Sequence, residues 1–366
     1  MSTKKDKFTL QDKIYMKFAI NLAKTNDGIT QPNPSVGCLV VKKNKIISYG
    51  VTNENGRPHA ENIALSKNRK NIAGSTVYVT LEPCSHYGKT PPCTTALIKA
   101  KVNKVIYSLE DIDSRSSNKA KKILTSNNIL TKSGLLKSET KKFYKKYIYV
   151  KNNKSPYVTG KLASSSNLYI LKNNSFITNE HSRKISHLLR YKNQAILTTY
   201  KTINTDNSKL TCRIKGLERF SPTKVVLDKN LKIKKNSFII NYNSKKKTII
   251  FHNSKNIKKI NYLKKRGIKL INFNTDNNDN FNLEKVLKKI YELGINTLLV
   301  EAGKKLTTKM IYKKLFNQFY FFKGKKIIKG NRKIKVNNIK KLLDNKFKNK
   351  KNIDTYLDND NLIHYY

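Results

Sequence analysis

One histidine and two cysteines in the first third of the chain have the types and spacing of a metal site. His59 opens the run His59-Ala60-Glu61, Cys84 follows a proline, and Cys93 lies nine residues further along. Three protein ligands leave a fourth coordination position for water, which is the open arrangement of a catalytic zinc rather than the closed one of a structural zinc. Zinc lowers the pKa of such a water to about 7 and so supplies hydroxide at neutral pH.

Glu61 is predicted to move the protons at this site. It lies two residues after His59, as in the H-x-E signature of the zinc deaminases, where the glutamate is not a ligand. A carboxylate there can take the proton of water, pass it to a ring nitrogen and help deliver one to a departing amine. The alternatives are a chance His-Ala-Glu and a distant histidine that closes a structural site. The complete H-x-E, P-C and C set favours hydrolytic deamination of an amino-substituted pyrimidine.

The three ligand-bearing segments are far apart in the sequence, so regular elements must bring them together. Strands are expected at 36–41, 46–49, 76–81 and 105–109, and helices at 60–65, at 93–100 and around the apolar spacing of 15–22. His59 then begins a helix, Cys84 follows a strand, and Cys93 begins the next helix, whose N-terminus would favour its thiolate. Strands that alternate with helices imply an α/β layered domain.

A second α/β segment follows a lysine-rich, weakly patterned stretch at 141–154. Pro156 forces an extended residue before it, so we place the boundary here and predict domains at 1–148 and 153–366. Strands are expected at 156–161, 194–198, 224–227, 247–251 and 297–300, and helices at 180–190 and 283–293, with Gly294 at the C-cap of the latter. The rest of 229–279 is too rich in Lys and Asn for its elements to be placed.

The composition is strongly basic, with 76 Lys and Arg against 23 Asp and Glu and a net charge of +53. A basic surface can bind nucleic acid, and a nucleic-acid-binding protein on a deaminase fold is one alternative function. However, only nine of the basic residues are arginine, and the lysines are spread over every segment. We therefore interpret the charge as a compositional bias and predict no specific nucleic-acid partner.

Other features point to a cytoplasmic location. The four cysteines are too few and too scattered for a disulfide scaffold, and the basic N-terminus has no apolar segment typical of a secretion signal. No stretch approaches the ~20 consecutive apolar residues that span a membrane. We expect small-molecule partners and no membrane partner; a homo-oligomer is compatible with the sequence.

Longer motifs surround the zinc ligands at 31–38, 58–61 and 81–93. The segment between the cysteines is longer than the P-C-x-x-C of most zinc deaminases, and its inserted loop carries His86 and Lys89. Together the motifs closely resemble the bifunctional deaminase–reductase family of riboflavin biosynthesis, and the long loop argues against cytidine and transfer-RNA adenosine deaminases. By the family pattern, Asn33 contacts the pyrimidine, His86 lines the pocket and Lys89 meets the substrate's phosphate.

This resemblance implies a cytidine-deaminase-like three-layer domain with one Zn²⁺ per chain. In the family, it converts 2,5-diamino-6-(5-phosphoribosylamino)pyrimidin-4(3H)-one to 5-amino-6-(5-phosphoribosylamino)uracil, so the expected partner is a small phosphorylated pyrimidine.

The resemblance continues through the second segment, in motifs such as Asp206-Asn207 and Val300 to Gly303. It implies a dihydrofolate-reductase-like α/β domain that uses NADPH to reduce the ribosyl group of the uracil product to ribityl. Residues at substrate-contacting positions are Asn174, Arg190, Leu210, Arg213 and Glu301. Those at NADPH-contacting positions are Ala163, Phe176, Thr202, Asp206 and Gly303. The G-x-G-x-x-G fingerprint of dinucleotide-binding sites is absent.

Three departures from the family pattern lie in the expected cofactor loops. Asn167 and Leu168 stand where the family has an aspartate and a glycine, and Lys201 replaces a glycine or small residue before Thr202. A bulky cation at 201 can crowd the nicotinamide or reach a cofactor phosphate. Two interpretations stay open: both reactions in one chain, and a working deaminase with a decayed reductase domain.

Overall fold

The computed structural model describes residues 8–67, 71–171, 176–242, 247–329, 333–353 and 360–366. The chain divides into two compact units, Met1–Asn153 and Lys154–Tyr366, here called unit 1 and unit 2. The stretch at 141–154, for which the sequence predicted no regular element, is largely helical. It contains the end of α5 (Lys137–Phe143) and all of α6 (Lys145–Asn153). Phe143, Tyr147 and Ile148 pack against the core at helical spacing, and the lysines between them hid this pattern.

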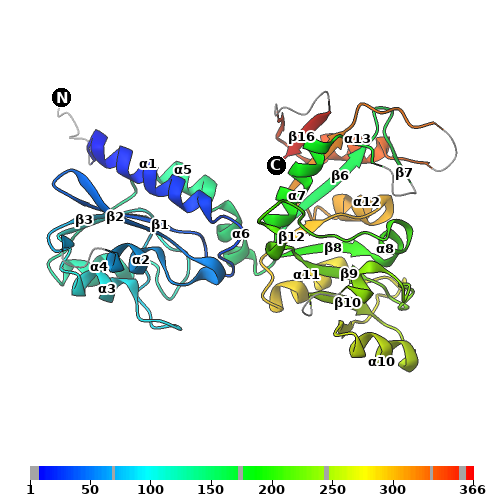
Figure 1. Ribbon diagram of the computed structural model, residues 1–366, viewed down its shortest axis with the longest axis horizontal. Coiled ribbons are helices and arrows are strands. Elements are labelled where there is room, and N and C mark those ends of the chain that lie inside the picture. Colours follow the sequence, from blue (N-terminus) through cyan, green and yellow to red (C-terminus); the bar gives the residue numbers. More distant parts are fainter. Residues whose placement is uncertain (1–7, 68–70, 172–175, 243–246, 330–332, 354–359) are drawn as a thin grey trace. The chain divides into compact units, whose positions relative to one another are not determined.

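Unit 1 is built on a mixed sheet. Its strands are β1 (Gly37–Lys42), β2 (Lys45–Val51), β3 (Thr76–Leu81), β4 (Lys104–Leu109) and β5 (Leu130–Ser133), in the order β2-β1-β3-β4-β5. β1 is antiparallel to β2 and β3, whereas β3, β4 and β5 are parallel. Helices α1 (Leu10–Thr25) and α5 cover one face, and α2 (Ala60–Ser66), α3 (Cys93–Lys99) and α4 (Lys119–Thr125) cover the other (Figure 1).

Both faces of this sheet are buried because helices cover each of them, and side chains that alternate along a strand enter both cores. In β1, Leu39 packs in one core with Met16 of α1, while Val40 packs in the other core with Ala60 of α2. Strands buried on both faces read as continuous apolar runs, which is why β3 could be predicted to the residue. The predicted three-layer α/β domain is confirmed.

Unit 2 contains a larger sheet. Its strands are β6 (Tyr157–Ser164), β8 (Ala195–Thr199), β9 (Thr223–Leu227), β10 (Thr248–His252), β11 (Lys269–Asn272), β12 (Thr297–Val300), β13 (Gln318–Lys323), β15 (Lys350–Asn352) and β16 (Asn361–Tyr365). The order is β11-β10-β9-β8-β12-β6-β13-β16-β15, parallel from β11 to β13, with β15 and β16 antiparallel at one edge. A separate ribbon pairs β7 (Tyr169–Leu171) with β14 (Lys333–Lys335).

Helices cover both faces of this sheet as well. On one side lie α7 (Glu180–Tyr191), α8 (Tyr200–Asp206), α9 (Phe238–Asn241) and α10 (Ile257–Lys265), and on the other α11 (Leu283–Glu292), α12 (Lys304–Tyr312) and α13 (Asn337–Lys346). Gly294 was expected at the C-cap of α11, but Leu293 is the cap and Gly294 follows it with φ +83°. None of the helices described is long and apolar enough to cross a membrane.

Candidate active sites

The three predicted zinc ligands lie together in unit 1. The candidate ligand atoms of His59, Cys84 and Cys93 are all within 4.8 Å of one another. Nδ1 of His59 is 3.3 Å from Sγ of Cys93 and 3.5 Å from Sγ of Cys84. One imidazole nitrogen and two sulfurs that converge in this way fit a catalytic zinc, with His59 bound through Nδ1 and a fourth position left open.

Local structure brings the ligands together and prepares one of them. His59 is the N-cap of α2, Cys84 follows β3, and Cys93 is the first residue of α3. The backbone N–H of Cys93 donates to Sγ of Cys84 at 3.2 Å. A hydrogen bond with the Cys93 thiol lowers the pKa of Cys84 to about 4. The backbone N–H at the start of α3 therefore stabilises the thiolate of Cys84.

Glu61 lies where the proton carrier was predicted. It is in the first turn of α2 and only 4% of it is exposed. Burial raises the pKa of Glu61 to about 6, and its carboxyl group is in hydrogen-bonding reach of Cys93. A carboxyl group with a pKa near the working pH can both accept and release a proton, which general acid–base catalysis requires.

Asn33 also lies at the metal site. Its Nδ2 donates to the carbonyl oxygen of Gly56 at 3.0 Å and lies 3.4 Å from Nε2 of His59. Gly56 has φ +80°, and a Cβ there would be 2.7 Å from the carbonyl oxygen of Thr30 and from Cβ of Asn33. Glycine is therefore required for this close approach, which places Asn33 beside the zinc ligand.

The loop between the cysteines is held from two sides. Nδ1 of His86 is 2.9 Å from Oγ of Ser116. Nη1 of Arg57 donates to Oγ1 of Thr90. Lys89, the predicted phosphate contact, is exposed. Sequence reasoning did not single out Arg57; the signal available was an arginine two residues before the first zinc ligand.

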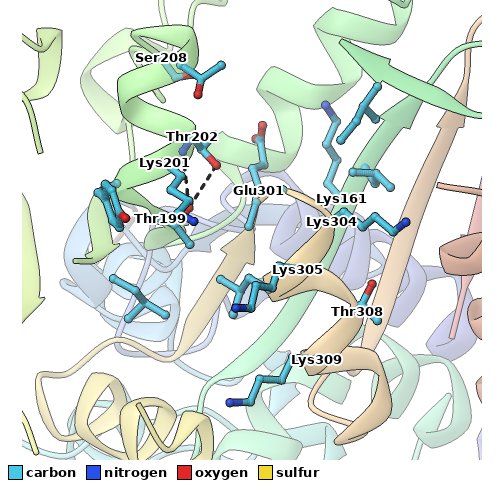
Figure 2. A pocket seen from close by; sticks show the side chains of 18 of the residues that line it. Lys161, Thr199, Lys201, Thr202, Ser208, Glu301, Lys304, Lys305, Thr308 and Lys309 are labelled. Atoms are coloured by element: carbon cyan, nitrogen blue, oxygen red, sulfur yellow. Dashed lines mark hydrogen bonds between the residues drawn. The ribbon is translucent and has the colours of Figure 1, made fainter. Parts of the chain in front are cut away.

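Unit 2 contains a cleft of about 1440 Å³ at the carboxyl ends of β6, β8, β9 and β12 (Figure 2). The predicted residues that line it are Ala163, Arg190, Thr202, Asp206, Leu210, Glu301 and Gly303. Two other predicted contacts, Phe176 and Arg213, are exposed and are not among the lining residues. Asn174 lies outside the described residues.

Charged groups meet in the wall of this cleft. Arg190 donates from Nε and Nη2 to the two carboxylate oxygens of Glu301 at 2.8 and 2.9 Å. Burial alone would raise the pKa of Glu301, but the charges of Arg190 and Lys161 hold it at about 2. Lys161 lines the same cleft, and burial lowers its pKa. Sequence reasoning did not assign Lys161 a role, although a lysine inside a buried strand is itself a signal.

Positive charge dominates the rest of the cleft. Figure 2 shows Lys201 of α8 on one side and Lys304, Lys305 and Lys309 of α12 on the other. Thr199 caps α8, and its Oγ1 accepts from the backbone N–H of Thr202 at 3.5 Å. Such a one-sided field favours an anionic ligand.

Two of the three residues that depart from the family pattern, Asn167 and Leu168, make defined contacts in unit 2. Oδ1 of Asn167 accepts from the Ser165 hydroxyl at 2.7 Å and from the Ile328 N–H at 3.1 Å, and its Nδ2 donates to the Ile328 carbonyl at 3.0 Å. Leu168 adopts φ +60° and packs against the core of unit 2. The loop at 165–168 is thus tied to the segment around Ile328 and to the core of unit 2.

Comparisons with known proteins cover both units. Residues 9–109 match the cytidine and deoxycytidylate deaminase zinc-binding region, and residues 157–356 match the RibD C-terminal domain. The riboflavin biosynthesis protein RibD of Aquifex aeolicus is 34% identical over 320 residues, which are 87% of this chain and 88% of that protein.

Solved structures agree over nearly the whole length. RibD from Acinetobacter baumannii, form 1, covers 97% of this chain and 98% of its own, with a TM-score of 0.82 and 25% identity. A diaminohydroxyphosphoribosylaminopyrimidine deaminase/5-amino-6-(5-phosphoribosylamino)uracil reductase from Thermotoga maritima covers the same shares, with a TM-score of 0.80 and 28% identity. These matches confirm the resemblance seen in the motifs, and the chain belongs to the RibD family of riboflavin biosynthesis proteins.

Proposed function

We propose that this protein catalyses two consecutive steps of riboflavin biosynthesis. Unit 1 deaminates 2,5-diamino-6-(5-phosphoribosylamino)pyrimidin-4(3H)-one to 5-amino-6-(5-phosphoribosylamino)uracil, and unit 2 reduces the ribosyl group of that product to ribityl with NADPH. The observation that carries the proposal is the convergence of His59, Cys84 and Cys93 beside the buried Glu61. The same chain contains unit 2, which matches the RibD C-terminal domain and has a cleft lined by several lysines.

In the deamination, zinc held by the histidine and the two cysteines supplies the Lewis acidity that makes water a nucleophile near neutral pH. Asn33, fixed by Gly56, holds the pyrimidine beside the metal site. Glu61 takes a proton from the attacking water and gives it to the ring nitrogen; it then takes the remaining proton of the added hydroxyl group and gives it to the leaving amine. Ammonia leaves, and the ring carbon that carried the amine becomes a carbonyl. His86 and Lys89 approach the substrate from the loop, Lys89 at its phosphate.

In the reduction, NADPH supplies the hydride. Thr202, Asp206, Ala163 and Gly303 line the cleft and would hold the cofactor there. Arg190 and Leu210 hold the substrate, and Glu301 is present as a carboxylate because the neighbouring cations keep its pKa at about 2. Glu301 therefore accepts hydrogen bonds from substrate hydroxyls and orients Arg190. Lys161 lies in the same wall and can donate a hydrogen bond to the substrate.

The test supplies the diaminopyrimidine substrate to the zinc-loaded full chain, with and without NADPH, and identifies the products by mass spectrometry. We expect the uracil product without NADPH and the ribityl product with it. Accumulation of the uracil product at millimolar NADPH would mean that unit 2 is a decayed reductase. Recovery of unchanged substrate in both reactions would overturn the proposal for unit 1.

A further inference from the structure

Arg57 touches the loop between the zinc ligands at two points. Its Nη1 donates to Oγ1 of Thr90. Its Nη2 lies 3.4 Å from the place where a Cβ on Gly88 would be. These two residues flank Lys89, so the guanidinium group contacts the loop on both sides of the residue proposed to bind the substrate's phosphate: the backbone at Gly88 and the side-chain hydroxyl of Thr90.

The base of Arg57 is itself fixed. The residue before it, Gly56, is held by the hydrogen bond from Asn33 and by close packing against Thr30. The chain then passes through Pro58 to His59, the first zinc ligand. Arg57 therefore links the loop to the same segment that places His59 and Asn33. Its contacts with the loop fix the position of residues 88–90 relative to those two residues.

Lys89 needs such a link because little else holds it. The side chain is exposed, and within the described part of the chain it makes no hydrogen bond or ion pair. A free lysine has high rotational entropy, and every degree of freedom that remains in its backbone weakens a single phosphate contact further. On the other side of Lys89, the nearest tether within the loop is His86 against Ser116.

We propose that Arg57 is a positioning residue for the deamination: by fixing Gly88 and Thr90 it places the ammonium group of Lys89 at the substrate's phosphate. Arg57 acts through Lys89 and does not itself take part in the proton transfers. The proposal rests on the proposed deaminase function, and turnover by the unaltered protein in the same assay tests that function separately.

The first experiment compares Arg57→Met with the unaltered enzyme on two substrates, the phosphorylated diaminopyrimidine and its dephosphorylated form. We expect the KM for the phosphorylated substrate to rise about tenfold, the size of a lost charge-assisted contact, with kcat and zinc content nearly unchanged. For the dephosphorylated form, kcat/KM should stay within about twofold. Equal losses on both substrates, or loss of zinc, would show a general structural role and overturn the proposal.

The matched control is Arg115→Met, which makes the same chemical change in the same unit. Arg115 is exposed and pairs with Asp113, and its hydrogen bonds do not involve residues 88–90. Its KM for the phosphorylated substrate should stay within about twofold, because Lys151 still pairs with Asp113 when Arg115 is replaced.

The second experiment asks whether Arg57 works through Lys89. Residues that act through one another give non-additive effects. In the background of Lys89→Ala, Arg57→Met should raise KM no further, and Thr90→Val alone should reproduce most of the effect of Arg57→Met. Additive effects of the two substitutions, or a silent Thr90→Val, would mean that Arg57 binds the phosphate directly and would overturn the positioning role.

Discussion

The guanidinium of Arg190 and the carboxylate of Glu301 form a bidentate pair in unit 2, although 111 residues separate them in the sequence. Arg190 is in the last turn of α7, and Glu301 directly follows β12. Both side chains are only 13% exposed. Because desolvation offsets most of the attraction in such a pair, its presence is weak evidence for stability. Its place in the wall of the cleft is better explained by a role in holding substrate.

Removing one partner of this pair should affect both the stability of unit 2 and the reduction. In Glu301→Gln, the charge of Arg190 stays buried without compensation, so we expect unit 2 to lose about 3 kcal/mol of stability. Reduction should fall sharply while deamination persists, because the two units have separate cores. Urea unfolding and the two product assays measure these effects. The control Glu292→Gln breaks an exposed pair with Lys289 and should change stability by less than about 0.5 kcal/mol.

Elements with a plain apolar pattern could be predicted from the sequence. β3 and β12 were predicted to the residue because each is a short run of β-branched, aromatic and other apolar residues, and both strands are largely buried. α5 and α6 were missed because lysines and other polar residues interrupt the apolar residues that mark their buried side. α8 and α12 were missed because both are short and no more than three residues separate each of them from the strand before it.

The candidate sites divide in the same way. His59, Glu61, Cys84 and Cys93 belong to local motifs whose spacing carries the chemistry, so the sequence was enough to predict that they meet. Arg57 and Lys161 were overlooked because their roles depend on neighbours that are distant in sequence.

The metal site leads to a second prediction. The purified protein should hold about one zinc per chain, and Cys84→Ser and Cys93→Ser should each lose zinc and deamination together. Glu61→Gln should keep the zinc but lose about 10²–10⁴-fold in rate, because only the proton carrier is removed. Metal analysis and ammonia release test this. Normal turnover by Glu61→Gln would show that its assigned role is wrong.

A third prediction concerns pH. Burial, together with the charges of Arg190 and Arg213, lowers the pKa of His187 to about 4, and its ring lies 3.1 Å from the carbonyl oxygen of Thr211. The unfolded chain takes up this proton near pH 6.5, before the folded chain does. The neutral ring therefore favours folding above pH 6.5, and this contribution is lost as the pH falls towards 4.

His187→Gln removes the titration, so the stability of unit 2 should fall less between pH 7 and pH 4.5 in the variant than in the unaltered protein. Urea unfolding at several pH values gives the difference directly. NMR titration of the ring provides an independent check, and a His187 that titrates near pH 6.5 would contradict the prediction.

A fourth prediction concerns the net charge of +53. We expect weak binding to DNA and RNA, indifferent to sequence, in the range of about 10⁻⁴–10⁻⁶ M at physiological salt. Affinity should fall steeply as salt rises, because each contact releases counterions. A nanomolar, sequence-specific complex at physiological salt would instead favour a nucleic-acid function.

The last prediction decides between the two effects expected of Lys201. This residue lines the cleft of unit 2 in the first turn of α8, one position before Thr202, and its side chain is exposed. Among the described residues it has no acidic partner, so its charge is available to a ligand. We expect it to contact a phosphate of NADPH rather than to crowd the nicotinamide.

Lys201→Ala should then weaken NADPH binding about fivefold, as the loss of one exposed ionic contact does. The affinity should also depend less on salt, because one screened attraction has been removed. Titration of NADPH fluorescence at two salt concentrations measures both effects. Lys215→Ala removes the same charge outside the lining of the cleft and should leave the affinity nearly unchanged. Tighter binding by Lys201→Ala would show that the lysine crowds the cofactor, and that a lysine in place of the family's small residue weakens NADPH binding.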